Sequence, residues 1–259
     1  MEYIFKILYN KYEVFLLVFT RVSGIFIISP FFSSQNIPNI LKIGFSFILS
    51  VLLSLILDIK ISLEGTNFVA LMAKELMVGL IIGFIAYMFF TIFYIMGQLI
   101  DMKIGFGMVN VMDPQHKVQV PLMGNFYYIL AFLILFSIDG HHMIIKAVVD
   151  SYELVPIGKF TFNEEITFSL INILSKTFTM GFRLAAPIIA IILMMDLLLG
   201  ILARTIPQMN VFVVGMPLKI LVGLLIISVS MPIFYSISIE IFNDTVTEIY
   251  SFLKSFVKG

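Results

Sequence analysis

The sequence contains no cysteine and no tryptophan, and only 12% of its 259 residues are charged. Without cysteine the chain has no disulfide, no thiolate metal site and no cysteine nucleophile. Its 16 basic and 16 acidic residues balance, so there is no cationic surplus of the kind that binds nucleic acid. Soluble domains are about a quarter charged. The low charge therefore points away from a soluble domain.

Long apolar runs make up most of the chain. Hydrophobic residues make up 60% of the chain, and its mean hydropathy is +1.08. A helix of about 20 apolar residues crosses the hydrocarbon core of a bilayer, whereas strands would need alternating apolar and polar residues. We therefore expect an all-α polytopic membrane protein with about six hydrophobic helices. The expected spans are residues 14–32, 41–57, 68–100, 120–138, 184–202 and 211–235.

Two further segments depart from simple spans. The run at 68–100 exceeds about 45 Å as a helix, so it must tilt, kink or project beyond the lipid. Residues 141–153 read HHMIIKAVVDSYE and place Ile144, Val148 and Tyr152 on one helical face, opposite His142 and Lys146. This pattern predicts an interfacial helix or one that faces a partner. A separate helix of mixed polarity is expected from about residue 166.

Ionisable residues interrupt three of the apolar runs: Arg21, Asp196 and Lys219. A charge at the bilayer centre costs at least ~2.5 kcal/mol, so each of them needs a reason. They either pair between helices and hold the bundle together, or line a polar path or bind other subunits. Lys74 and Glu75 begin the third run as neighbours, and for Lys74 we favour a position near the membrane interface.

Small residues indicate close packing in the third run. Gly79 and Gly83 form a GxxxG face, which allows two helix backbones to approach closely. The partner is either another helix of this chain or a neighbouring subunit.

Enzyme signatures are absent. GFGMVN at 105–110 lacks the third glycine and the preceding strand of a dinucleotide site, and no GxxxxGK[ST] phosphate loop occurs. His141 and His142 are adjacent, so on a helix they point about 100° apart, unlike a metal-binding i, i+4 pair. We therefore predict no enzyme activity, no cofactor and no metal.

The connector GFGMVNVMDPQ lies between the third and fourth runs. Its glycines permit unusual backbone conformations, Asp-Pro favours a turn, and methionines adapt to irregular surroundings. This chemistry suits a plug that fills a pore when closed. Composition alone favours the alternative, an ordinary flexible loop. The residues of this connector are Gly105, Phe106, Gly107, Met108, Val109, Asn110, Val111, Met112, Asp113, Pro114 and Gln115.

Seven separated segments carry a specific resemblance. They are RVSGIFIISPFFSSQNIP (21–38), KELMVGLIIGF (74–84), GQLIDMKIGFGMVNVMDPQ (97–115), QVPLMGNFYY (119–128), DGHH (139–142), SYELVPIG (151–158) and PQMNVFVVGMPLKILVG (207–223). In this order they resemble the FliR/SctT family of membrane proteins of type III export. GFGM, GHH and SYELVPIG favour the flagellar branch over the virulence injectisome branch. Lys103 departs from the pattern, which has glutamine there.

The resemblance implies a core subunit of the flagellar export gate in the bacterial inner membrane, within the basal body. Its partners would be FliP, FliQ and FlhB, with unfolded exported proteins as transient substrates. Residues 1–160 would be FliP-like and 161–259 a FliQ-like closing hairpin, in a single membrane domain. Residues 105–115 match the family's plug loop. The polar residues expected at intramembrane or assembly positions are Arg21, Glu75, Gln98, Asp101, Asp196, Gln208, Asn210 and Lys219. A secondary transporter for a small solute is the alternative that the charges in the spans suggest.

Overall fold

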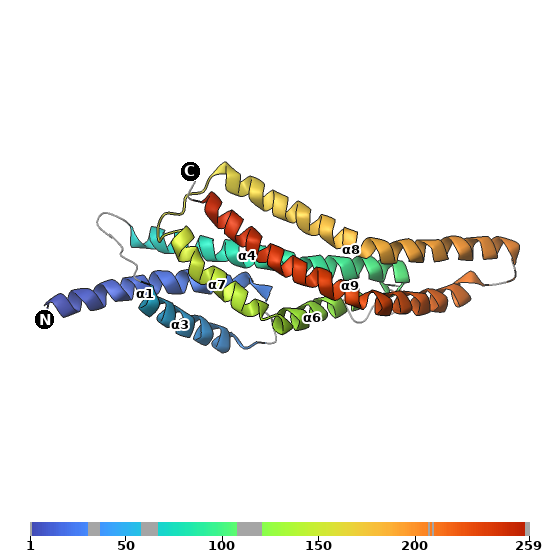
Figure 1. The fold of residues 1–259 in the computed structure, drawn as a ribbon, viewed down its shortest axis with the longest axis horizontal. Coiled ribbons are helices and arrows are strands. Elements are labelled where there is room, and N and C mark those ends of the chain that lie inside the picture. Colours follow the sequence, from blue (N-terminus) through green and yellow to red (C-terminus); the bar gives the residue numbers. More distant parts are fainter. Residues whose placement is uncertain are drawn as a thin grey trace. The chain divides into compact units, whose positions relative to one another are not determined.

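Seven helices form the secondary structure of the part of the chain that the computed structural model describes, residues 2–30, 37–57, 67–107, 121–206, 208 and 210–256 (Figure 1). No strand occurs within these residues, which confirms the predicted all-α class. The helices are α1 (Glu2–Ile28), α3 (Asn39–Ile56), α4 (Phe68–Ile104), α6 (Leu122–Ser137), α7 (Gly140–Leu154), α8 (Glu164–Thr205) and α9 (Val211–Ser255).

Three of these helices are longer than a membrane crossing requires. α4 has 37 residues, α8 has 42 and α9 has 45. At about 1.5 Å per residue each exceeds 50 Å, against roughly 30 Å of hydrocarbon. Pro187 lies inside α8, and Pro217 and Pro232 lie inside α9, without ending the helix. The mixed helix expected from about residue 166 and the span expected at 184–202 are therefore one continuous helix.

Four described helices are long and apolar enough to cross a membrane: α3, α4, α8 and α9. The number rises to five if α6 and α7, which are bent by 73° at the break between them, count as one span. Six were expected, and the first of them falls in α1. That helix is not among the candidates, because Lys11, Glu13 and Arg21 interrupt its apolar sequence.

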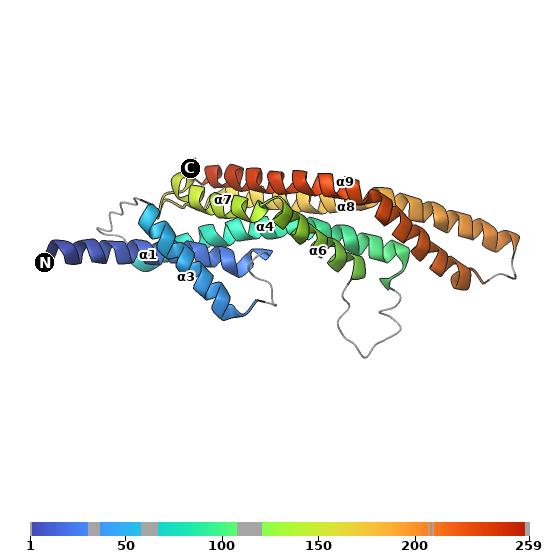
Figure 2. The same ribbon diagram turned by 60° about the horizontal axis from the view of Figure 1, so that its bottom comes forward.

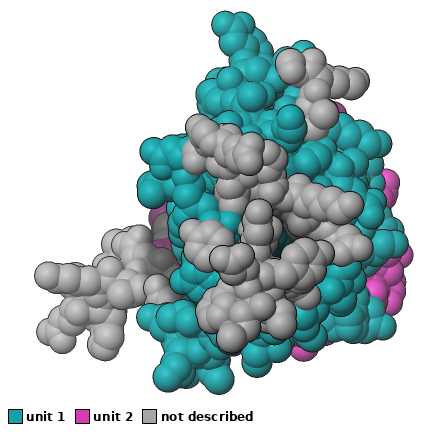
Figure 3. Space-filling view, turned by 90° about the vertical axis from the view of Figure 1, so that its left-hand side faces the viewer, with its two compact units in different colours: residues 1–88, 139–173, 243–259 teal, residues 89–138, 174–242 magenta. Residues whose placement is uncertain are grey.

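The chain divides into two compact units (Figure 3). Unit 1 contains residues 1–88, 139–173 and 243–259, and unit 2 contains residues 89–138 and 174–242. Each unit draws on segments from both sides of residue 160. The division into a FliP-like part and a FliQ-like hairpin at that residue therefore stays a prediction.

Unit 1 is held together by α1, which lies beside α3 (Figures 1 and 2) and against the first part of α4. Aromatic rings join α1 to α3: Phe15 and Phe47 lie 5.3 Å apart, and Phe26 and Phe45 lie 5.7 Å apart between centroids. Helix α7 buries Ile144, Val148 and Tyr152. This confirms the apolar face that the sequence predicts for residues 141–153.

Unit 2 contains an antiparallel hairpin formed by residues 174–205 of α8 and 211–242 of α9 (Figures 1 and 2). An aromatic cluster joins this hairpin to α4 and α6. Phe234 lies 5.7 Å from Phe93 and 4.9 Å from Tyr127 between ring centroids, and Phe90 lies 5.4 Å from Phe242. Burying aromatic side chains is among the strongest contributions to packing, so this cluster is the core of unit 2.

Candidate functional site

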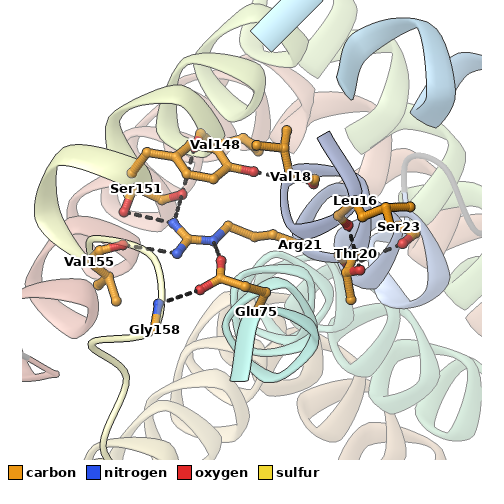
Figure 4. A network of polar contacts seen from close by, with 11 residues as sticks. Leu16, Val18, Thr20, Arg21, Ser23, Glu75, Val148, Ser151, Val155 and Gly158 are labelled. Carbon is orange, nitrogen blue, oxygen red and sulfur yellow. Dashed lines mark hydrogen bonds and ion pairs between the residues drawn. The ribbon is translucent and has the colours of Figure 1, made fainter. Parts of the chain in front are cut away.

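A buried cluster of polar groups surrounds Arg21 in unit 1 (Figure 4). Arg21 extends from α1, and its side chain is 0% exposed. Its Nε donates to Glu75 Oε2 of α4 at 2.7 Å, and the Glu75 side chain is also 0% exposed. The structure thus brings together two charged residues that the sequence singles out, 54 positions apart. A charge-assisted hydrogen bond of this length is among the strong ones.

The remaining guanidinium nitrogens bind the end of α7. Nη1 donates to the Ser151 carbonyl oxygen at 3.0 Å and to Ser151 Oγ at 3.1 Å, and Nη2 donates to the Val155 carbonyl oxygen at 2.9 Å. The guanidinium carbon also lies 4.2 Å from the centre of the Tyr152 ring. The Val155 carbonyl lies just beyond the last residue of α7, where helix carbonyls have no partner within the helix, and the arginine supplies one. The Ser151 carbonyl already accepts Val155 N at 2.9 Å and gains the arginine as a second donor.

Glu75 and its neighbour fix the turn that follows α7. Gly158 N donates to Glu75 Oε1 at 3.0 Å, and Lys74 Nζ donates to the Gly158 carbonyl oxygen at 3.2 Å. Gly158 has φ +77°, a conformation that favours glycine. Arg21 is therefore paired within the chain, in a cluster that links α1, α4, α7 and the SYELVPIG segment.

Glycines let α1 and α4 approach closely enough for this cluster to form. A Cβ added to Gly79 would overlap the Arg21 carbonyl, and one added to Gly83 would lie 3.1 Å from the Ile25 carbonyl oxygen. On the other helix, a Cβ on Gly24 would lie 2.8 Å from the Leu76 carbonyl oxygen. The GxxxG face predicted at Gly79 and Gly83 thus packs against a helix of the same chain. Sequence reasoning missed Gly24, whose signal is its position three residues after Arg21.

In unit 2, Asp101 holds the start of α6. Its carboxylate accepts hydrogen bonds from Met123 N at 2.9 and 3.0 Å and from Gly124 N at 3.3 Å. The residue before this helix is Pro121, which has no side-chain oxygen to offer. An aspartate from α4 therefore does the capping, and it also complements the positive end of the helix. Gln98, one turn earlier in α4, is exposed.

Asp196 of α8 and Lys219 of α9 form an ion pair in the hairpin, with side chains 38% and 24% exposed. The pair borders a cavity of about 530 Å³ that is otherwise lined mainly by apolar groups and glycines. Lys103, Gly105 and Gly107 from the end of α4 also line it. The structure thus joins two predicted intramembrane charges and places the start of the predicted plug loop beside them.

Reversing one member of this pair should destabilise the protein, and reversing both should restore it. Either Asp196→Lys or Lys219→Asp leaves two like charges in a mostly apolar hairpin, at an expected cost of about 1–3 kcal/mol, reduced by the partial exposure of both side chains. Thermal unfolding followed by circular dichroism in detergent measures this. If the double variant is no more stable than the less stable single variant, the attraction between residues 196 and 219 does not contribute to the stability of the protein.

The short turn between α8 and α9 contains the last predicted polar residues. Asn210 Oδ1 accepts a hydrogen bond from Phe212 N at 3.1 Å, so Asn210 caps the start of α9. Gln208 is exposed. Of the predicted plug residues, Gly105, Phe106 and Gly107 are described, and residues 108–115 lie outside the described part of the chain.

A family model described as "Bacterial export proteins, family 1" matches residues 12–245. The chain belongs to this family. The match includes the Arg21 cluster, Asp101 and the pair of Asp196 and Lys219, and it confirms the resemblance found in the sequence.

Members of the bacterial export family are similar to the chain along nearly its whole length. Flagellar biosynthetic protein FliR of Bacillus subtilis is 36% identical over 241 residues, which is 92% of this chain and 93% of that protein. The protein of the same name from Aquifex aeolicus is 30% identical over 246 residues, 93% and 94% of the two chains. The one from Escherichia coli is 26% identical over 226 residues, 86% of each.

One group in this export-family chain escaped sequence reasoning. Asp139, His141 and His142, at the break between α6 and α7, bring one possible ligand atom each to within 4.8 Å of one another. The two histidines alone do not suggest a metal site. The signal in the sequence was the aspartate two positions before the pair.

Proposed function

We propose that this chain is a membrane subunit of the flagellar type III protein-export gate, forms part of the export channel and carries a plug loop at residues 105–115. The observation that carries the proposal is the 36% identity to FliR of Bacillus subtilis over 92% of the chain. The family model, with its export description, and the long apolar helices support it. Its proposed cellular location is the bacterial inner membrane, within the flagellar basal body.

The proposed partners are FliP, FliQ and FlhB-type subunits in a hetero-oligomeric complex, with unfolded exported proteins as transient substrates. The lengths of α8 and α9 support an assembly. Each is roughly twice as long as the hydrocarbon core is thick, so part of each must lie beyond the hydrocarbon. On α8, apolar side chains before the expected span at 184–202 remain exposed, including Phe168 at 64%, Ile171 at 54% and Phe178 at 61%. Exposed apolar surface outside lipid is stable when other proteins cover it.

The plug proposal rests on sequence and resemblance, with one supporting feature from the described residues. Gly105 ends α4 with φ +102°, a conformation that other residues rarely adopt. Gly107 follows, and a Cβ added there would meet no atom within 4 Å. Helix α4 therefore ends in a segment whose backbone can turn away from the helix axis, beside the cavity bordered by Asp196 and Lys219.

Replacing residues 105–115 by a Gly/Ser linker of equal length tests the plug directly. The variant should still copurify with FliP-like and FliQ-like subunits, and cells that express the complex should become permeable to small ions and solutes. A Gly/Ser linker of equal length in place of residues 58–66, another connector between two helices, serves as the control. An assembled variant that stays ion-tight and exports normally would remove the plug from the proposal, whereas failure of the unaltered chain to copurify with those subunits would remove the export-gate assignment itself.

A secondary transporter is the competing function, and the Arg21 cluster weighs against it. Each of the three guanidinium nitrogens donates to a group of this chain, so Arg21 offers little to a passing solute. Gradient-driven uptake of a small solute by the purified chain alone in liposomes would favour the transporter instead.

A further inference from the structure

The break between α6 and α7 presents three metal-ligating side chains together. α6 ends at Ser137 and α7 begins at Gly140, and the two helices differ in direction by 73°. Asp139 lies in the break with φ 55° and ψ 25°, the one described residue other than glycine with positive φ. Such a conformation is costly for most residues, and it is often retained where function requires it.

Asp139 occupies the N-cap position of α7 without acting as a cap. Aspartate at an N-cap normally accepts a hydrogen bond from a backbone N–H of the first turn, but this side chain makes no capping hydrogen bond. Its carboxylate lies beside His142 instead, with Oδ1 3.7 Å from Nδ1. The Asp139 side chain is 78% exposed and that of His142 is 70% exposed. The carboxylate therefore remains available to a ligand.

The rings of His141 and His142 lie close together at the start of α7. Their centroids are 4.1 Å apart, with the ring planes inclined by 39°. One nitrogen of each ring and one oxygen of Asp139 lie within 4.8 Å of one another. In a tetrahedral zinc site with bonds of about 2.0–2.2 Å, neighbouring ligand atoms are about 3.3 Å apart. Asp139 and His142 are exposed and His141 is partly buried. Small rotations of the two exposed side chains toward His141 would bring the three atoms to that spacing.

We propose that Asp139, His141 and His142 form a binding site for a divalent transition-metal ion of the Zn²⁺ class. Two imidazole nitrogens and one carboxylate oxygen suit zinc and its neighbours, whereas Mg²⁺ and Ca²⁺ prefer all-oxygen ligands. Three ligands from one chain leave a coordination position open on the exposed side. This ion would hold the Asp139 carboxylate against the first turn of α7. The competing explanation is an Asp139–His142 ion pair without metal.

Titration of the purified full-length chain with ZnCl₂ tests this proposal. The protein is purified without a polyhistidine tag, because such a tag would itself bind Zn²⁺. Isothermal titration calorimetry in detergent measures the heat of binding. We expect one Zn²⁺ per chain, with no heat from MgCl₂. His142→Ala and His141→Ala should each weaken binding at least tenfold, because each removes a ligand. His116→Ala is the matched control, since it removes the third histidine of the sequence and should leave binding unchanged.

Asp139→Gly separates loss of a ligand from loss of the fold. Glycine accepts the positive φ of this position without strain, so the variant should fold at least as well as the unaltered chain. It should still bind Zn²⁺ at least tenfold more weakly. The proposal is overturned if the unaltered chain binds no more Zn²⁺ than the His141→Ala/His142→Ala double variant, or if Asp139→Gly binds as tightly as the unaltered chain. The site does not depend on the plug loop, so these results are independent of the export tests.

Discussion

Replacing Arg21 by alanine is expected to destabilise unit 1 by about 3–5 kcal/mol, because it leaves the Glu75 carboxylate buried without its partner. In the same step the Val155 carbonyl oxygen loses the Arg21 donor, and the Ser151 carbonyl oxygen keeps only its hydrogen bond from Val155 N at 2.9 Å. Each buried acceptor without a partner adds to the cost. Because a small domain is stable by only about 5–15 kcal/mol, this single change should remove much of the folded population.

A set of matched variants separates the charge from the hydrogen bonds. Glu75→Gln keeps a group of the same shape that can still accept from Gly158 N, so it should cost less than Arg21→Ala. Arg21→Met with Glu75→Leu removes both charges and should recover part of the loss, but not the contacts to the end of α7. Lys74→Ala is the control: its ammonium contacts the Gly158 carbonyl at 3.2 Å in the same region, and its loss should cost under about 1 kcal/mol.

Thermal unfolding by circular dichroism in detergent, together with the monodisperse fraction after heating, measures the series. Arg21→Ala equal in stability to Lys74→Ala would show that the cluster does not hold the unit together. That result would instead support the alternative that Arg21 lines a polar path or binds a partner subunit.

The charges in this cluster were predictable from sequence, but their partners were not. Arg21 and Glu75 stand out because each interrupts an apolar run. Ser151 and Val155 lie about 130 positions from Arg21 and contribute mainly backbone carbonyls, which every residue has. No local pattern indicates which carbonyls a distant arginine will bind. Only the packing of α7 against α1 and α4 decides this.

Helix boundaries were predictable where hydrophobicity and helical periodicity agree. The apolar face of residues 141–153 is the face that α7 buries. In α8, by contrast, the sequence predicts a mixed helix from about residue 166 and a separate span at 184–202. The structure has one helix there, because a hydropathy pattern detects spans rather than helices. A helix that continues past the hydrocarbon core can include charges and a proline without ending.

In the candidate site, too, some features were predictable from the sequence and others were not. Asp196 and Lys219 were singled out as charges in apolar runs, with pairing between helices as one alternative, and the structure joins them in an ion pair. Asp101 was recognised as part of a motif, but its role in capping α6 depends on the approach of α4 to Pro121 and Met123. Sequence indicates which polar groups need a partner, and the tertiary arrangement determines which partner they find.

Gly79→Ala is expected to destabilise the contact between α1 and α4 by about 1–3 kcal/mol, although alanine is the better helix former. The added Cβ would overlap the Arg21 carbonyl and lie 3.0 Å from its carbon and 3.2 Å from Gly24 Cα. All of these are backbone atoms, so the whole helix must move to relieve the overlap. That movement would also draw the Arg21 side chain away from Glu75, and a Gly79→Leu variant should fail to fold.

Gly44→Ala in α3 is the matched control, because no atom lies within 4 Å of a Cβ added there. Its helix should gain up to about 1 kcal/mol, so the two Gly→Ala changes are expected to have opposite signs. Thermal unfolding in detergent compares them directly. Equal effects would mean that α1 and α4 do not need a close approach at Gly79. If the approach does position Arg21, then Gly79→Ala should cost less in an Arg21→Ala background than in the unaltered chain, because part of its effect has already been lost.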